Sequence, residues 1–215
     1  MSNHAASVPL PLVNGVEPFV RQTYWIFLTT LVAIIALGFA SHYFLPTTSF
    51  GPLGVADSLI WVLCGWFGWR RPVILTLPLF SIITGLFLGQ LAARYSPPTF
   101  AAASVLTLVA FAGLSAFVHF TKQSFTFLRG FLTVSFFVML GGCLIFFFMP
   151  VRPAMILLTA FGTIVFGCWV LYDTSQIMER ADDELTPAIA ALELMIDIVG
   201  LHRWLMNLLD LQERD

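Results

Sequence analysis

The sequence predicts an all-α polytopic membrane protein, a bundle of seven transmembrane helices. Of its 215 residues, 59% are hydrophobic and only 10% are charged, whereas soluble domains carry about 25% charged residues. Apolar runs recur along the whole chain, and about 20 helical residues cross about 30 Å of hydrocarbon. Because seven such runs account for nearly all residues, we expect a lipid bilayer around the protein and no soluble domain.

The chain divides into an N-terminal tail and a membrane domain. Residues 1–22 are small and polar and include three prolines, which predicts a flexible cytoplasmic tail. Residues 23–215 form the predicted transmembrane domain. Its first apolar run is too long for the core of a signal peptide and has no basic segment before it, so we interpret it as an uncleaved span.

Turn-forming or charged residues separate the apolar runs and set the predicted helix boundaries. The first span opens on Tyr24 and Trp25, an aromatic pair typical of the membrane interface. The second is the shortest and carries Asp57 near its start, most simply as a charge that favours a helix N-terminus. The last has Thr186 as a predicted N-cap and Pro187 at the first helical position. In order, the predicted spans are residues 24–45, 53–69, 73–93, 100–120, 125–149, 154–177 and 187–211.

The distribution of Lys and Arg predicts the orientation, since cytoplasmic loops carry an excess of both. With the N-terminus inside, six basic residues fall on the cytoplasmic side and three on the other. The six are Arg21, Arg70, Arg71, Lys122, Arg129 and Arg180, and the three are Arg94, Arg152 and Arg214. We therefore expect a cytoplasmic N-terminus.

Two aspartates, Asp173 and Asp197, lie inside the last two apolar runs. A carboxylate within a membrane helix costs about 2.5–3.5 kcal/mol, so it is rare unless paired, hydrated or functional. The two helices are antiparallel neighbours, and a rise of about 1.5 Å per residue places both aspartates at similar depths in the cytoplasmic half. If they meet, they share a proton and titrate as a unit. The alternative is two separate aspartates, each satisfied by backbone or hydroxyl donors.

Other polar residues of this region have two interpretations each. Glu193 precedes Asp197 by four residues and is either a third carboxylate of a cation path or faces a cytoplasmic vestibule. Arg203 is either an intramembrane counter-charge or extends toward the outer interface. The acidic run Asp182-Asp-Glu184 is a solvated loop or the mouth of a calcium path.

The motifs along the chain resemble those of the Bax inhibitor family, the transmembrane Bax-inhibitor-motif proteins. The similarity spans residues 20–215 and depends on the order and spacing of short motifs. The opening and closing motifs, Arg21-Gln-Thr-Tyr24 and Glu213-Arg-Asp215, are similar to the bacterial YccA branch. The others are Thr84-Gly-Leu-Phe-Leu-Gly89, Leu114-Ser-Ala116, residues 121–132, Gly162-Thr-Ile-Val-Phe166, Leu171-Tyr-Asp173, Gln176-Ile177, Ile196-Asp-Ile198 and Asn207-Leu-Leu209.

This resemblance implies a bundle with its seventh helix at the centre and a pH-sensitive calcium leak of the bacterial inner membrane. It implies that Asp173 and Asp197 form the di-aspartyl sensor, with calcium as the transported ion and no cofactor. YccA-type relatives are also implied to modulate the membrane protease FtsH through the N-terminal tail, which leaves a non-conducting modulator as the alternative. The family's latch arginine has no clean counterpart, because Phe67 takes its place. Arg70 and Arg71 lie about a turn away and are the candidate latch residues.

Other function classes fit the sequence less well, and we expect no enzyme. An intramembrane aspartyl protease needs Gly-x-Gly-Asp before its second aspartate, whereas this chain has Leu194-Met-Ile-Asp197. A rhomboid-like pair could be drawn between Ser115 and His119 or His202, but a serine in an apolar helix usually bonds its own backbone. No basic patch predicts nucleic-acid binding, and no metal site is evident.

Overall fold

The structure is a computed structural model that describes residues 16–46, 49–66, 73–149, 151–179 and 186–213. Within these ranges it is all-α and has seven helices, which confirms the predicted fold class. They are α1 (Val16–Phe44), α2 (Phe50–Trp66), α3 (Val73–Ala92), α4 (Pro97–Thr121), α5 (Leu128–Phe148), α6 (Arg152–Glu179) and α7 (Pro187–Glu213).

The helix boundaries differ from the predicted ones chiefly at the start of the chain. α1 begins at Val16, within the range assigned to the tail, and includes Pro18 in its first turn. Proline is tolerated there because the first backbone N–H groups of a helix have no intrahelical acceptor. The rest of the predicted tail, residues 1–15, lies outside the described residues. The predicted cap of α7 is confirmed, since the Ile189 backbone N–H donates to Thr186 Oγ1 at 3.3 Å.

Five of the described helices are long and apolar enough to cross a membrane, namely α1, α3, α4, α5 and α6. α2 is apolar but shorter, and α7 carries several charged side chains. The chain is therefore a multi-pass membrane bundle, in which α2 and α7 depart from the pattern of a simple apolar span.

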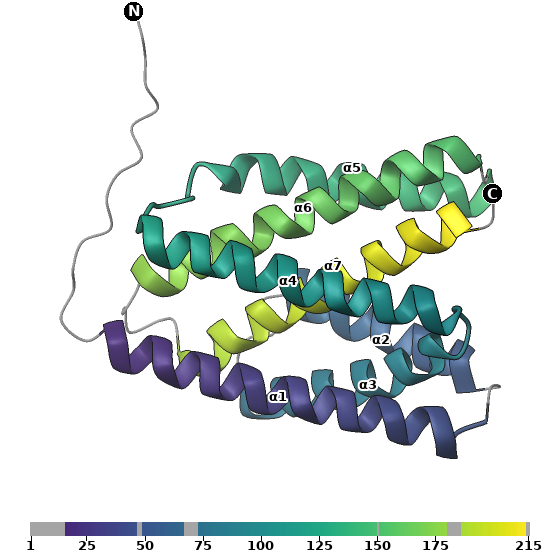
Figure 1. The fold of residues 1–215 in the computed structure, drawn as a ribbon, viewed down its shortest axis with the longest axis horizontal. Coiled ribbons are helices and arrows are strands. Elements are labelled where there is room, and N and C mark those ends of the chain that lie inside the picture. Colours follow the sequence, from purple (N-terminus) through teal and green to yellow (C-terminus); the bar gives the residue numbers. More distant parts are fainter. Residues whose placement is uncertain (1–15, 47–48, 67–72, 150, 180–185, 214–215) are drawn as a thin grey trace, which may run out of the picture.

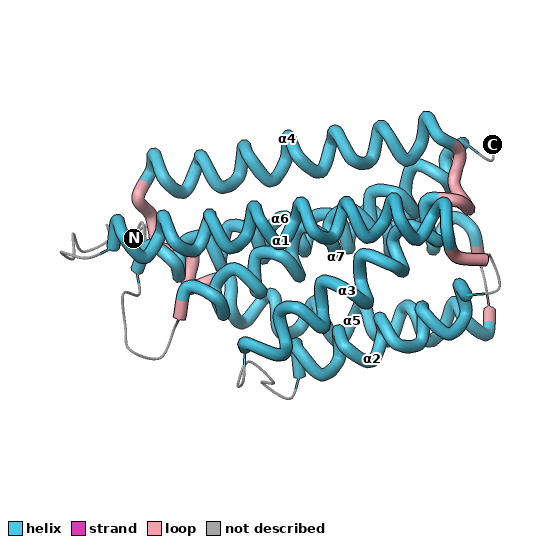
Figure 2. Tube along the Cα trace, turned by 90° about the horizontal axis from the view of Figure 1, so that it is seen from below, coloured by secondary structure: helices cyan, strands magenta, loops and turns pink. Residues whose placement is uncertain are grey.

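α7 occupies the centre of the bundle, as Figure 1 shows, and contacts α1, α3, α4 and α6. Many of its side chains are buried, including Leu194 and Met195, which have no exposed surface. α5 lies at the periphery, where it contacts α6 and exposes large apolar side chains such as Val134 and Leu144. Figure 2 shows the helices running roughly along one common direction. The polar helix is thus shielded from lipid by the apolar ones.

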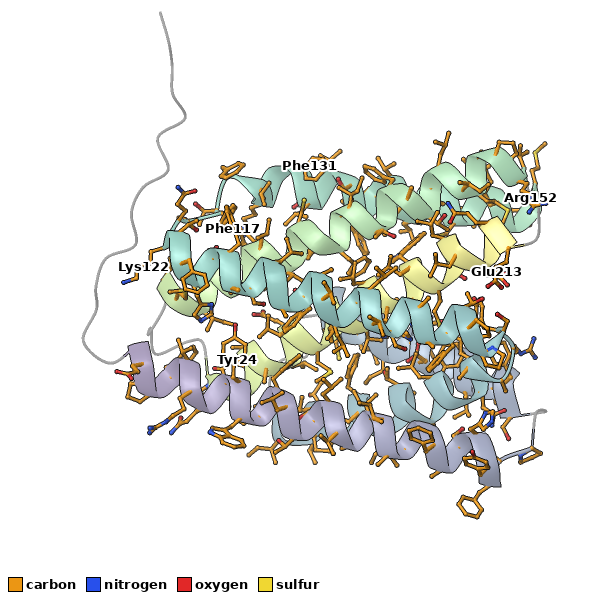
Figure 3. All side chains as sticks on the ribbon, viewed as in Figure 1. Tyr24, Phe117, Lys122, Phe131, Arg152 and Glu213 are labelled. Atoms are coloured by element: carbon orange, nitrogen blue, oxygen red, sulfur yellow. The ribbon has the colours of Figure 1, made fainter. Side chains whose placement is uncertain are left out.

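The starts of α1 and α7 lie at the same end of the bundle as the ends of α4 and α6 (Figure 1). We call this the inner end, because the sequence predicts that it faces the cytoplasm. Figure 3 shows Lys122 at the inner end and Arg152 and Glu213 at the opposite, outer end. α6 therefore ends at the inner end and α7 begins there. Asp173 lies on the first of these helices and Asp197 on the second.

α1 and α3 approach so closely that only glycine fits at their contact. A Cβ atom at Gly89 would collide with the backbone carbonyl group of Gly38, and one at Gly85 would lie 3.0 Å from the Ile34 carbonyl oxygen. Next to these glycines, Gln90 Nε2 donates to the Ser41 carbonyl oxygen at 2.9 Å. Close contact between helices in a membrane depends on such small residues.

We expect Gly89→Ala to separate α1 from α3 and to lower the stability by about 1–3 kcal/mol, the usual cost of overpacking. The measurement is the thermal unfolding midpoint of the purified protein in detergent. Gly113→Ala is the matched control, because a Cβ atom there meets nothing within 4 Å. An equal effect of both changes would contradict this account of the α1–α3 contact.

Candidate functional site

The hairpin of α6 and α7 brings the two intramembrane aspartates together. Two glycines allow the helices to pack closely: a Cβ atom at Gly162 would lie 2.5 Å from Trp204 Cδ2, and one at Gly200 would collide with the Phe166 ring. These contacts fix the register of the hairpin, and the register sets Asp173 opposite Asp197.

The Asp173 and Asp197 carboxyl groups lie close together, within interaction distance of each other. Both side chains are buried, with exposed fractions of 8% for Asp173 and 3% for Asp197. Two buried carboxyl groups this close can form a direct hydrogen bond when one of them holds a proton. The second Asp197 oxygen, Oδ2, is buried and has no hydrogen-bond partner within the described residues.

Further carboxyl groups lie between the aspartate pair and the inner end. Glu193 is half-buried and close enough for its charge to act on Asp197. At the end of α6, Gln176 Nε2 donates to Glu179 Oε2 at 3.3 Å. The position of Glu193 agrees with a third carboxylate near the pair. Among the described residues, no group of three or more side chains has the arrangement of a metal site.

A second buried charge site connects α2 with α7. Arg203 Nη1 donates to Asp57 Oδ2 at 2.6 Å, and Thr84 Oγ1 of α3 donates to Asp57 Oδ1 at 2.8 Å. Asp57 has no exposed surface, whereas the Arg203 side chain is 27% exposed. The guanidinium group also lies over the Trp61 and Phe87 rings, with its central carbon 5.4 and 5.1 Å from the ring centroids. Three helices thus meet at one neutralised ion pair.

This site corrects the sequence interpretation of Asp57. We expected a charge at a helix start, but Asp57 is the eighth residue of α2 and fully buried. Two alternatives were considered for Arg203, and the structure shows the first of them, an intramembrane counter-charge. One signal for this pair was present in the sequence, namely two opposite charges in apolar helices, but the two residues are 146 positions apart.

The other candidate residues lie apart from the aspartate pair or outside the described residues. His119 Nδ1 is 2.8 Å from the Ser115 backbone oxygen rather than its hydroxyl, and His202 Nδ1 is 3.3 Å from Thr107 Oγ1. The described residues therefore contain no Ser–His hydroxyl pair at these positions. The candidate latch residues Arg70 and Arg71 lie outside the described residues, as do Phe67 and the acidic run Asp182-Asp-Glu184.

Comparison with known proteins places the whole described chain in one family. The sequence matches the family model described as Inhibitor of apoptosis-promoting Bax1 over residues 16–214. It is 31% identical over 206 residues to an uncharacterized protein of Campylobacter jejuni, covering 89% of this chain and 87% of that protein. It is 33% identical over 138 residues to Bax inhibitor 1 of Schizosaccharomyces pombe, covering 64% of this chain. That match spans 52% of the yeast protein, or about half of its length.

A third relative extends the similarity to a viral protein. The Golgi anti-apoptotic protein of vaccinia virus is 23% identical over 235 residues, covering 99% of this chain and 93% of the viral protein. The relatives are therefore bacterial, fungal and viral.

The ion pair gives a stability prediction. Arg203→Gln leaves Asp57 buried without its counter-charge, so we expect a loss of about 3–5 kcal/mol. Thermal unfolding in detergent measures the change, and Arg129→Gln on the exposed surface of α5 is the matched control. Combining Asp57→Asn with Arg203→Gln should restore much of the loss, because no uncompensated charge remains. If Arg203→Gln unfolds like the Arg129 control, the ion pair contributes nothing to stability.

Proposed function

The chain belongs to the family described as Inhibitor of apoptosis-promoting Bax1, and from this premise we propose that it is a proton-tuned cation leak. We place it in the bacterial inner membrane, with its N-terminus in the cytoplasm and calcium as the transported ion. The single observation that carries the proposal is the buried contact between the Asp173 and Asp197 carboxyl groups.

The proposal starts from the charge of this pair. With one proton, the two carboxyl groups hold α6 and α7 together through their hydrogen bond. Without it, two negative charges about 4 Å apart repel by about 4 kcal/mol at an effective dielectric constant near 20. A change from 1:99 to 99:1 in a two-state equilibrium requires about 5.5 kcal/mol, so a repulsion of this size shifts such an equilibrium strongly. Loss of the proton therefore favours separation of α6 and α7.

The chemistry of the inner half supports a cation as the conducted species. Carboxylate oxygens are the ligands that hard cations such as calcium prefer. Deprotonation gives the pair the negative charge that attracts a cation, and Glu193 adds a third carboxylate on the inner side. In this proposal the separated helices expose these oxygens to a path from the inner end.

The Asp57–Arg203 pair has a complementary role in the proposal. It joins α7 to α2 six residues beyond Asp197, which is about 9 Å further along the helix axis. An arginine–carboxylate pair carries no net charge and needs no proton for neutrality. We therefore propose that it restrains the outer part of α7 while the aspartate pair opens. This is the latch role for which Arg70 and Arg71 were the candidates from the sequence.

The test is calcium flux into liposomes that contain the purified protein, measured at several pH values with a dye inside. We expect flux to rise with pH near neutrality, because the deprotonated pair opens the bundle. Asp173→Asn and Asp197→Asn each remove one titrating group, so each should abolish the pH dependence while leaving the fold intact. Glu17→Gln, at an exposed site in the first turn of α1, is the matched control.

The outcomes of this experiment separate the candidate functions. Single aspartate variants that keep the wild-type pH profile would show that the two residues are only satisfied polar groups of the core. A wild-type protein that carries no calcium would instead favour the non-conducting role, modulation of FtsH, that the resemblance to YccA implies. A lifetime measurement after deletion of residues 1–15 would then test the tail as the contact of the protease, with α1 left complete.

A further inference from the structure

Three helices place hydroxyl groups together inside the inner half of the bundle. The Tyr24 hydroxyl of α1 faces the hydroxyls of Ser115 on α4 and Thr174 on α6. Ser115 is 7% exposed, Thr174 has no exposed surface, and the Tyr24 oxygen is buried. Yet none of the three oxygen atoms makes a hydrogen bond of good geometry within the described residues. We call these three residues the hydroxyl site.

The lack of a helix-backbone bond distinguishes Ser115 from the three hydroxyl residues of α4 at positions 104, 107 and 121. Ser104, Thr107 and Thr121 each donate to the carbonyl oxygen four residues earlier, at 2.7 to 2.8 Å. This local bond is the usual way for a hydroxyl to be satisfied inside a helix. The oxygen of Ser115 makes no such bond and lies beside the Tyr24 hydroxyl instead. The same holds for Thr174 on α6, so the space between the helices must supply the partners.

Water fits this arrangement. Buried water molecules typically make about three hydrogen bonds to polar groups that otherwise have no partner. The hydroxyl site offers three such groups from three different helices. Asp197 Oδ2 is a fourth buried oxygen atom without a partner in the described part of the chain.

The hydroxyl site lies in the inner half of the bundle, at about the depth of Asp173. Tyr24 is on the same end of the bundle as Lys122, as Figure 3 shows. Thr174 directly follows Asp173 in α6 and is one residue closer to the helix end at Glu179. The half-buried His119 ring packs against Tyr24, with ring centroids 5.7 Å apart. The titratable groups around the site are therefore His119 on α4, Asp173 and Glu179 on α6, and Glu193 and Asp197 on α7.

We infer that Tyr24, Ser115 and Thr174 bind water inside the bundle and that this water carries protons between the inner end and the aspartate pair. The inference rests on the proposed function in that the pair must exchange a proton with the solution. Each hydroxyl accepts a proton on its oxygen and passes its own to the next acceptor, so it is unchanged after transfer. The net step converts hydronium at the inner end into water and one carboxylate of the pair into a carboxyl group.

The experiment follows the arrival of the proton rather than the flux of an ion. Protons are released by a flash of light around the protein in liposomes, and infrared absorption records the protonated carboxyl bands. Bands that belong to the pair are those that a variant combining Asp173→Asn and Asp197→Asn lacks. The variants are Tyr24→Phe, Ser115→Ala and Thr174→Val, which remove the hydroxyls with little change of volume. Thr121→Val is the control, since that hydroxyl bonds its own helix near the same end.

We expect each hydroxyl variant to reach the wild-type band amplitude, but about tenfold more slowly. The Thr121 control should keep the wild-type rate. A merely structural role would lower the thermal unfolding midpoint without slowing proton arrival in the folded protein. Should one variant fail to fold, the other two provide the same comparison from different helices.

Two results would overturn the inference, and they differ in what else they affect. Wild-type rates in all folded hydroxyl variants would exclude the water route alone. A wild-type pair that takes up no proton at any pH would exclude both the route and the proposed function. If the variants slow proton arrival in a protein that conducts no calcium, the route stands and only the leak is wrong.

Discussion

The rest of the structure depends on keeping charged side chains neutral inside an apolar bundle. An ionised side chain at the centre of a membrane helix costs about 2.5–3.5 kcal/mol, and α7 carries Asp197 and Arg203 among its buried and half-buried residues. That cost explains why α7 lies between α1, α3, α4 and α6 and does not face lipid. It also explains why these two side chains each meet a partner from another helix, Asp173 of α6 for Asp197 and Asp57 of α2 for Arg203. The central place of α7 is thus a consequence of its polarity.

Small residues make this arrangement sterically achievable. Gly162 and Gly200 admit Trp204 and Phe166 into the α6–α7 contact, and the register that results sets the two aspartates opposite each other. On the other side of the bundle, Gly89 lets α1 approach α3, which carries the Thr84 hydroxyl that donates to Asp57. Both charge sites therefore depend on backbone contacts that a single added methyl group would disturb.

The sequence predicted those features that depend on local composition. The number of helices, most of their boundaries and the cap at Thr186 follow from apolar runs and turn residues, and the aspartate pair followed because α6 and α7 are consecutive antiparallel helices. The start of α1 was placed too late because residues 16–22 lack apolar periodicity, although they are helical. The Asp57–Arg203 pair and the hydroxyl site could not be predicted, because their members come from helices distant in sequence. Only the packing of α2, α3 and α7, or of α1, α4 and α6, brings them together.

The two charge sites on α7 are neutralised in different ways, and the proposed function depends on this difference. Arginine is effectively always protonated, so its pair with Asp57 is neutral without any exchange of protons. Two carboxyl groups are neutralised only by protons taken from the solution, and Asp173 and Asp197 lie closer to the inner end than Arg203 does. The hydroxyl site lies on that same side, where water could reach the pair. In the proposed function, a change of pH therefore acts on the inner part of α7, while the ion pair holds its outer part against α2 and α3.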